Sequence, residues 1–316
     1  MTPRTAAGLL KCRPVRPGSR VALVAPASPF RPEELEAGVA ELRRIGLQPV
    51  FEERIFERQG FVAGSARSRS AELLRTWRRL DVDAIIAARG GYGSVQVLPM
   101  LDQAAIRASR TTFVGYSDVT SIHAVLGCRI GMTSVHGPMI EGRLSKGPSA
   151  YDVPSFLASL TAQPLGELAP QGLDVIRSGE TRGPLFGGTL TQLLASMSTP
   201  FEFRPPAGHV LFLDEVGERP YRLHRMLTQC RLSGLLALSA AVVFGQLPGC
   251  DEPGAGGPTA RDVIKEIFAD FPGPVILGFP SGHTITPLVS LPLGVETRVI
   301  ADARPRVVIE EAAAGE

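Results

Sequence analysis

The chain has 316 residues, with 33 Lys and Arg against 31 Asp and Glu, so its formal net charge is only +2 at pH 7. This near balance gives no long-range field to gather nucleic acid or an anionic membrane surface, so small molecules or peptides are the expected partners. The length is about twice that of a usual domain, which predicts two domains with separate cores. No apolar stretch reaches the roughly 20 residues that a membrane helix needs.

The cysteines and the N-terminal residues indicate the compartment. Residues 1–14, MTPRTAAGLLKCRP, lack the combined basic, apolar and small-residue features of a secretory signal. The cysteines form neither a CxxC motif nor paired metal-ligand spacing. They are Cys12, Cys128, Cys230 and Cys250. We therefore expect a reduced, cytoplasmic protein whose cysteines form no metal site.

Strands and helices alternate in the N-terminal part of the chain. This pattern predicts βαβ units and a doubly wound, mostly parallel sheet. The first helix places Leu35, Val39 and Leu42 on one apolar face. The expected elements, in chain order, are a strand at 21–28, a helix at 31–46, a strand at 47–53, a helix at 66–81, and strands at 82–88, 111–117 and 131–138 with a helix at 118–127.

Pro, Gly and Ser are scattered through residues 145–182, which predicts a connection between domains at 15–144 and 183–316. The second domain is expected to be mixed α/β with a curved sheet. Its expected elements are helices at 187–197, 220–236 and 261–270, and strands at 209–216, 240–247, 274–279, 286–301 and 304–311.

A glycine-rich corner, RGGYGS at 89–94, follows an apolar strand. In open α/β sheets ligands bind beyond the carboxyl ends of the strands. Such a corner could cradle a phosphate or present a backbone N–H to an oxyanion. Neither GxGxxG nor GxxxxGK[ST] occurs, so the phosphate interpretation is weak, and a tight structural turn remains the alternative.

The next strand ends in GYSDVT, which puts Ser117 at a strand-to-helix corner. A nucleophilic serine needs such an exposed position, but the match to the GxSxG elbow is partial, because Val119 stands at the fifth position. The alternative is that Ser117 caps the following helix.

A serine nucleophile also needs a base and an acid that orients it. His283, in LGFPSGHT, follows an apolar strand at a Gly-rich turn and is the best candidate base. Asp214 and Glu215 end another buried strand, where uncompensated carboxylates are costly. The remaining histidines are expected to have other roles. His123 is expected in a packing or surface position and His136 in a structural one, and His209 and His224 are expected on the surface.

Five blocks, RGGYGS, GYSDVT, GGTLTQL, LDEVGERPYRLHRML and GFPSGH, occur in order across almost the whole chain. Together they resemble the serine LD-carboxypeptidases of peptidase family S66, which also contains the microcin C self-immunity peptidase. The resemblance implies an N-terminal sheet domain like that of class I glutamine amidotransferases, a C-terminal domain with a β-barrel-like core, and a homodimer without cofactors.

The resemblance also implies a catalytic triad. Ser117 corresponds to the nucleophile and His283 to the base. The family's acid is the Glu of a Glu-Asp pair, whereas this chain has Asp214-Glu215, so register assigns the position to Asp214. Glu215 could reach His283 only if the strand end twists or bulges, because successive strand side chains point to opposite faces.

The remaining site residues surround the glycine corner. The backbone N–H groups of Gly91 and Asp118 correspond to the oxyanion hole, although Gly90 is an alternative to Gly91. Arg89 and Tyr92 are candidates for substrate binding, and a surface ion pair is the alternative for Arg89.

The activity implied by the resemblance is release of the C-terminal D-alanine from cytoplasmic murein tetrapeptides through an acyl-enzyme. The sequence leaves open whether lysine or diaminopimelate precedes it. One alternative is a microcin C-type peptidase that cleaves a peptidyl-nucleotide; it would need an aromatic loop, and the only tryptophan, Trp77, lies on an early helix. Another is a non-catalytic α/β module that binds a small ligand.

Overall fold

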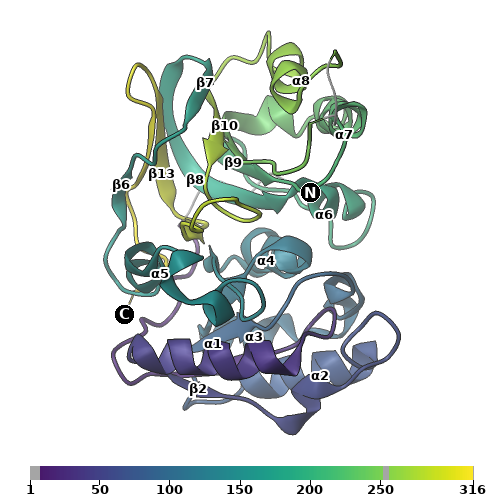
Figure 1. Cartoon of the computed structure of the whole chain (residues 1–316), viewed down its shortest axis with the longest axis vertical. Coiled ribbons are helices and arrows are strands. Elements are labelled where there is room, and N and C mark those ends of the chain that lie inside the picture. The colour runs from purple at the N-terminus through teal and green to yellow at the C-terminus, as the bar shows by residue number, and fades with distance from the viewer. Residues whose placement is uncertain (1–7, 252–255, 316) are drawn as a thin grey trace.

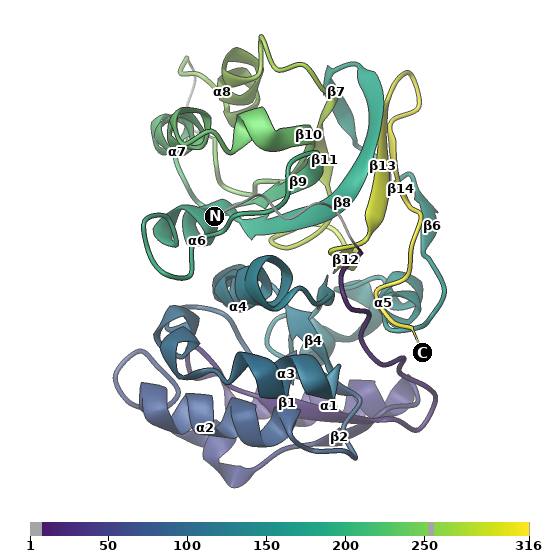
Figure 2. The same cartoon turned by 180° about the vertical axis from the view of Figure 1, so that it is seen from behind.

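The computed structural model describes residues 8–251 and 256–315, so part of the N-terminal stretch searched for a signal, residues 1–7, lies outside them. The chain folds into two lobes stacked along the long axis, each built around a mixed sheet (Figure 1). The same two lobes are seen from behind in Figure 2. None of the described helices is long and apolar enough to cross a bilayer.

The first sheet has six strands in the order β12-β5-β4-β3-β1-β2. The strands are β1 (Arg20–Val24), β2 (Gln48–Val50), β3 (Ala84–Ala87), β4 (Thr112–Gly115), β5 (Ser134–His136) and β12 (Leu291–Leu293). Strands β1 to β5 pair in parallel, so the expected mostly parallel sheet is confirmed. The exception is β12, which returns from the C-terminal part of the chain and pairs antiparallel with β5.

Local sequence accounts for the helices of this lobe, which are α1 (Pro32–Arg44), α2 (Ala66–Trp77), α3 (Gln103–Ser109) and α4 (Thr120–Val125). Helix α1 starts with a proline, Pro32, whose fixed φ suits the first helical position. Acidic residues in its first turn and arginines in its last turn complement the helix dipole. The apolar face predicted from periodicity is buried against the sheet.

The second sheet has eight strands in the order β6-β14-β13-β8-β9-β10-β11-β7. Its strands are β6 (Gly166–Leu168), β7 (Asp174–Arg177), β8 (Gly179–Thr189), β9 (His209–Asp214), β10 (Ser239–Gly245), β11 (Val275–Phe279), β13 (Glu296–Ala301) and β14 (Arg306–Ile309). The helices of the C-terminal half are α5 (Val153–Ser159), α6 (Leu190–Ala195), α7 (Pro220–Leu232) and α8 (Ala260–Ile267). Much of the expected connection, residues 145–182, thus belongs to regular structure.

The expected β-barrel-like core is wrong, because the described second sheet is open. Its edge strands β6 and β7 are consecutive in the chain, but each pairs only with its inner neighbour, β14 or β11. Both are short, and residues 169–173 join them without a ladder of hydrogen bonds between the two strands.

The backbone at the end of β8 packs closely on a side chain of the first lobe. Gly187 and Gly188 have φ of 144° and 143°, a region that side chains rarely adopt. A Cβ on Gly188 would lie 2.5 Å from Thr120 Oγ1 of α4. That hydroxyl accepts a hydrogen bond from the Thr189 N–H at 3.1 Å. The end of β8 therefore abuts the helix that follows Ser117.

Buried histidines are a feature of both lobes. His123, His136 and His209 are each at most 3% exposed. The surface position expected for His209 is therefore wrong; its ring contacts the Pro206 carbonyl and the Ser239 hydroxyl. Burial lowers the pKa of His209 from 6.5 to about 4.

This lowered pKa predicts acid sensitivity. The unfolded chain takes up a proton on His209 near pH 6.5, but the folded protein does so only near pH 4, so stability falls as pH falls between these values. Over this interval the wild type should lose roughly 3 kcal/mol more unfolding free energy than His209→Gln. Urea unfolding across the range measures the difference. If the unfolding free energy changed equally with pH in the two proteins, the prediction would be contradicted.

Candidate active site

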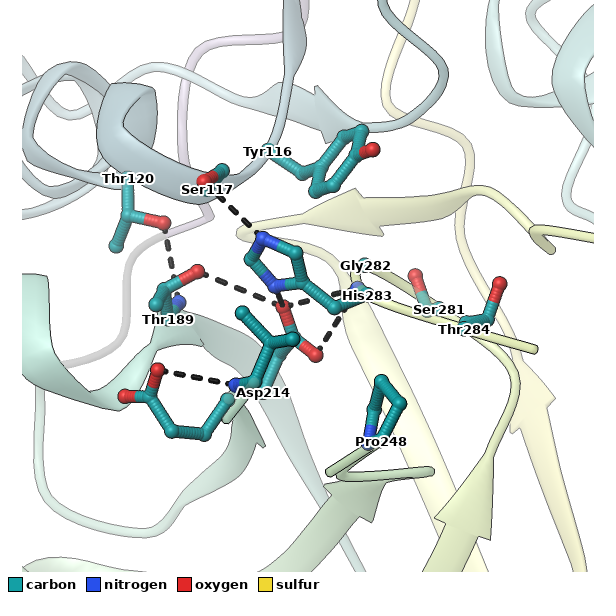
Figure 3. A network of polar contacts seen from close by, with 12 residues as sticks. Tyr116, Ser117, Thr120, Thr189, Asp214, Pro248, Ser281, Gly282, His283 and Thr284 are labelled. Atoms are coloured by element: carbon teal, nitrogen blue, oxygen red, sulfur yellow. Dashed lines mark hydrogen bonds and ion pairs between the residues drawn. The ribbon is translucent and has the colours of Figure 1, made fainter. Parts of the chain in front are cut away.

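Ser117 lies at the junction of the two lobes, separated from the end of β4 only by Tyr116, and starts a 3-10 turn (Ser117–Val119) that leads into α4 (Figure 3). Its φ is 65°, an uncommon value for a residue with a side chain. The N-cap positions of this turn and of α4 are held by Tyr116 and Val119, so Ser117 is the N-cap of neither. Instead, Ser117 Oγ lies 3.2 Å from Nε2 of His283, so the elbow presents the hydroxyl to the imidazole of the other lobe.

Asp214, the last residue of β9, lies on the far side of that imidazole (Figure 3). Its Oδ2 is 2.7 Å from His283 Nδ1. The His283 backbone N–H also donates to both carboxylate oxygens, at 3.1 Å each. Gly282 makes this approach possible, since a Cβ there would lie 2.3 Å from Asp214 Oδ2. Ser117, His283 and Asp214 thus form one continuous chain of polar contacts.

The Glu215 side chain points away from the contacts between Ser117, His283 and Asp214, because successive side chains of a strand face opposite sides. Its Oε2 accepts hydrogen bonds from the Thr191 N–H at 2.9 Å and the Thr191 hydroxyl at 2.7 Å. Its Oε1 accepts from the Val216 N–H. Glu215 therefore holds the first turn of α6 and has no contact with His283.

Both carboxyl groups are buried, and burial raises the pKa of each. For Asp214 the hydrogen bonds and the charge of His283 act against that rise in pKa, as does the Thr189 hydroxyl at 3.5 Å. Thr189 was not foreseen as a site residue. It lies in the GGTLTQL block, but its role depends on the pairing of β8 with β9, which sets Thr189 beside Asp214.

The glycine corner packs directly against the nucleophile's elbow. A Cβ on Gly90 would lie 2.8 Å from Ser117 Cβ and 3.0 Å from its Oγ. Gly91, with φ of 93°, instead faces Ser28, whose hydroxyl a Cβ would approach to 2.4 Å. Gly90 therefore allows the corner to approach Ser117 closely, and Gly91 allows it to approach Ser28.

Asp118 is buried and ties the elbow to the glycine corner. Its Oδ2 accepts from the Ser94 N–H at 2.8 Å, and its carbonyl accepts from the Ser94 hydroxyl at 2.6 Å. The fully buried Arg69 donates to the Gly93 carbonyl at 2.7 Å and supports the same corner. Sequence patterns did not reveal Ser94 or Arg69, because their partners come from distant segments.

Arg89 and Tyr92 flank this corner. Arg89 donates to the Pro29 carbonyl at 2.7 Å, and its Nε lies 3.5 Å from Glu141 Oε1, so the ion pair considered as its alternative role is present. Tyr92 is 45% exposed and meets Phe61 edge-on, with ring centroids 5.3 Å apart. Across residues 8–251 and 256–315, no group of three His, Cys, Asp or Glu side chains could hold a metal ion.

The contact of Gly90 with Ser117 predicts that Gly90→Ala blocks the site. The added methyl would lie 2.8 Å from Ser117 Cβ, so the elbow must shift. We expect labelling of Ser117 by a fluorophosphonate to fall by about 100-fold, the order that a misplacement near 1 Å produces. Gly8→Ala is the control, because Gly8, like Gly90, does not have a positive φ and a Cβ there meets nothing within 4 Å. Wild-type labelling of Gly90→Ala would contradict the prediction.

Comparison with known proteins identifies the family. Residues 21–137 match the model of the LD-carboxypeptidase N-terminal domain of peptidase family S66, and residues 182–299 match that of its C-terminal domain. The murein tetrapeptide carboxypeptidase of Pseudomonas aeruginosa is 31% identical over 272 residues, which are 84% of this chain and 88% of that protein.

Solved structures agree with this match. The muramoyltetrapeptide carboxypeptidase of Oxalobacter formigenes has a TM-score of 0.83 at 26% identity and covers 93% of this chain and 99% of its own. A second similar protein is the microcin C7 self-immunity protein MccF, which is also found among the sequence relatives, from Escherichia coli. Its structure in complex with aspartyl sulfamoyl adenosine has a TM-score of 0.89. That structure is 21% identical and covers 97% of this chain and 100% of its own. This chain belongs to the LD-carboxypeptidase family, peptidase family S66.

Proposed function

We propose that this protein is a serine LD-carboxypeptidase that releases the C-terminal D-alanine from murein tetrapeptides. The observation that carries the proposal is the contact chain from Ser117 Oγ through His283 to Asp214, with distances of 3.2 and 2.7 Å. This is the arrangement of a nucleophile, a base and an acid that orients the base. The murein peptide substrate is supported by the names of the relatives in Pseudomonas aeruginosa and Oxalobacter formigenes.

The proposed reaction has two halves. His283 Nε2 takes the proton as Ser117 Oγ attacks the carbonyl carbon that precedes D-alanine. The imidazolium, stabilised by Asp214, then protonates the leaving amine as the C–N bond breaks. Water attacks the resulting ester by the same steps, and Ser117 regains its proton from the imidazolium.

The proposed oxyanion hole is formed by the N–H groups of Gly91 and Asp118. The Gly90 carbonyl accepts from the Ser28 N–H at 3.1 Å, so the Gly91 N–H, at the other end of that peptide unit, points away from Ser28. This orientation supports Gly91 rather than Gly90 as the donor. Fixed donors of this kind stabilise the charge that develops on the carbonyl oxygen.

Two further parts of the proposal rest on the family resemblance. We infer that the enzyme acts on murein peptides recycled in the cytoplasm and that it works as a homodimer. The residue before D-alanine is either lysine or diaminopimelate, and a panel of both tetrapeptides assayed for released D-alanine decides between them.

A second candidate is cleavage of a peptidyl-nucleotide, as the microcin C-type resemblance suggested. Trp77 cannot stack on a base, because it is only 1% exposed. The partly exposed pair of Phe61 and Tyr92 beside the glycine corner favours this candidate, since aromatic faces stack on bases. Parallel assays with a tetrapeptide and an aminoacyl sulfamoyl adenosine distinguish the two substrates.

Replacement of the nucleophile gives the direct test. Ser117→Ala removes the attacking oxygen, and D-alanine release should fall by about 10⁶-fold, the order found when a serine nucleophile is removed. The wild type should keep its activity in EDTA, because every proposed step uses protein groups. Wild-type turnover by folded Ser117→Ala would refute the serine mechanism.

A matched pair of variants tests the acid. Asp214→Asn should lower turnover by roughly 10⁴-fold, because the neutral amide no longer holds His283 in the right tautomer. Glu215→Gln keeps the shape of a side chain whose hydrogen bonds go to Thr191 of α6 and to the Val216 N–H, so its turnover should stay within a few-fold of the wild type. The opposite ranking would assign the role to Glu215.

A further inference from the structure

The base lies in a segment that has no regular structure of its own. Residues 280–286, which follow β11 and contain His283, form neither helix nor strand. No ladder of backbone hydrogen bonds therefore fixes this segment. Its conformation depends on side chains from elsewhere, and the contacts of the peptide group that precedes His283 are the most informative.

Two charged side chains hold this peptide group from opposite ends. The His283 N–H donates to the Asp214 carboxylate at 3.1 Å. The Gly282 carbonyl, at the other end of the same peptide unit, accepts from Arg143 Nη2 at 3.1 Å. Arg143 Nη2 also donates to the Thr284 carbonyl at 3.2 Å. An anion at the N–H and a cation at the C=O match the peptide dipole, so both bonds are charge-assisted.

Arg143 also contacts the segment that carries the nucleophile. Its Nε donates to the Tyr116 hydroxyl at 3.4 Å, and its guanidinium carbon lies 5.9 Å from the centroid of that ring. The Tyr116 ring meets the His283 ring edge-on, with centroids 5.2 Å apart. Arg143 therefore touches the residue before Ser117 and both neighbours of His283.

The acceptors of Arg143 distinguish it from Arg89. Arg89 has the Glu141 carboxylate at 3.5 Å. For Arg143, within the described part of the chain, the acceptors are the Tyr116 hydroxyl and main-chain carbonyls, including that of Ala150 at 3.1 Å. A planar guanidinium can donate to several carbonyls at fixed angles, which a lysine cannot do.

We propose that Arg143 is a positioning residue for the reaction, which fixes the Gly282–His283 peptide and so aligns the imidazole with Ser117. The inference rests on the proposed function. Arg143 touches no reacting atom; it acts through His283. Its loss frees the Gly282 and Thr284 carbonyls, and His283 can then tilt about its remaining contacts with Asp214.

The test compares Arg143→Gln and Arg143→Lys by three measurements: fluorophosphonate labelling of Ser117, kcat and KM for a tetrapeptide, and thermal unfolding. Arg143→Gln should lower both the labelling rate and kcat by about 100-fold, the order expected for a misplaced catalytic group, with KM almost unchanged. Arg143→Lys keeps the positive charge but not the planar guanidinium, so its losses of labelling rate and kcat should be intermediate. Labelling reports the alignment of Ser117 and His283 without any substrate carboxylate.

Arg107→Gln is the matched control. Arg107 Nη1 likewise donates to two carbonyls, those of Ile130 and Gly131, but that segment carries none of the proposed catalytic residues. This variant should lose stability while its folded fraction labels at the wild-type rate.

Wild-type labelling of the folded Arg143 variants would overturn the inference. A rise confined to KM would also overturn it, because Arg143 would then bind substrate rather than position the base. If the wild type itself neither labels nor releases D-alanine, the proposed function fails instead.

Discussion

The contact between the buried Asp214 carboxylate and His283 is the interaction on which the site depends. A carboxylate at the end of β9 is costly to bury unless donors surround it. His283 supplies two of them, its backbone N–H and its ring, and Thr189 of the neighbouring strand supplies a third. The same bonds that satisfy the acid therefore fix the position of the base.

The site exists only where the two lobes meet. Ser117 comes from the first sheet, whereas His283 and Asp214 come from the second lobe (Figure 3). Gly188 at the end of β8 lets this strand pack closely on the Thr120 side chain of α4, so the lobes cannot slide without breaking this contact. Strand β12 adds a covalent return from the second lobe into the first sheet. The distance of 3.2 Å between Ser117 Oγ and His283 Nε2 thus depends on these contacts between the lobes.

Polar side chains with distant partners hold the loops around Ser117. Ser94 binds both the side chain and the carbonyl of Asp118, and Arg69 binds the Gly93 carbonyl. On the other side, Asp214 and Arg143 hold the two ends of one peptide unit. Loops without backbone ladders need such partners, because an unpaired buried polar group costs free energy comparable to a lost hydrogen bond.

The sequence by itself determined the parallel sheet of the first lobe, the main helices and the family. Apolar periodicity is local, so α1 and strands β1, β3 and β4 could be predicted from their own residues. It also placed Ser117 and His283 at strand ends. Strands β6 and β7 were assigned to a connection, because their exposed and half-buried residues give no clear alternation. The buried end of β8 was missed because Gly187 and Gly188 carry no apolar side chain, and these residues were assigned to a helix.

Only the tertiary structure decided how these segments meet. In the structure the second sheet is open and β12 pairs within the first sheet. His209 is buried, and Asp214 rather than Glu215 lies within hydrogen-bond distance of His283. Alternation predicts that neighbouring strand residues face opposite sides, but which side holds the histidine depends on packing between segments far apart in the chain. Arg143 illustrates the same limit, since its partners beside His283 lie 139 and 141 residues away and no local pattern encodes them.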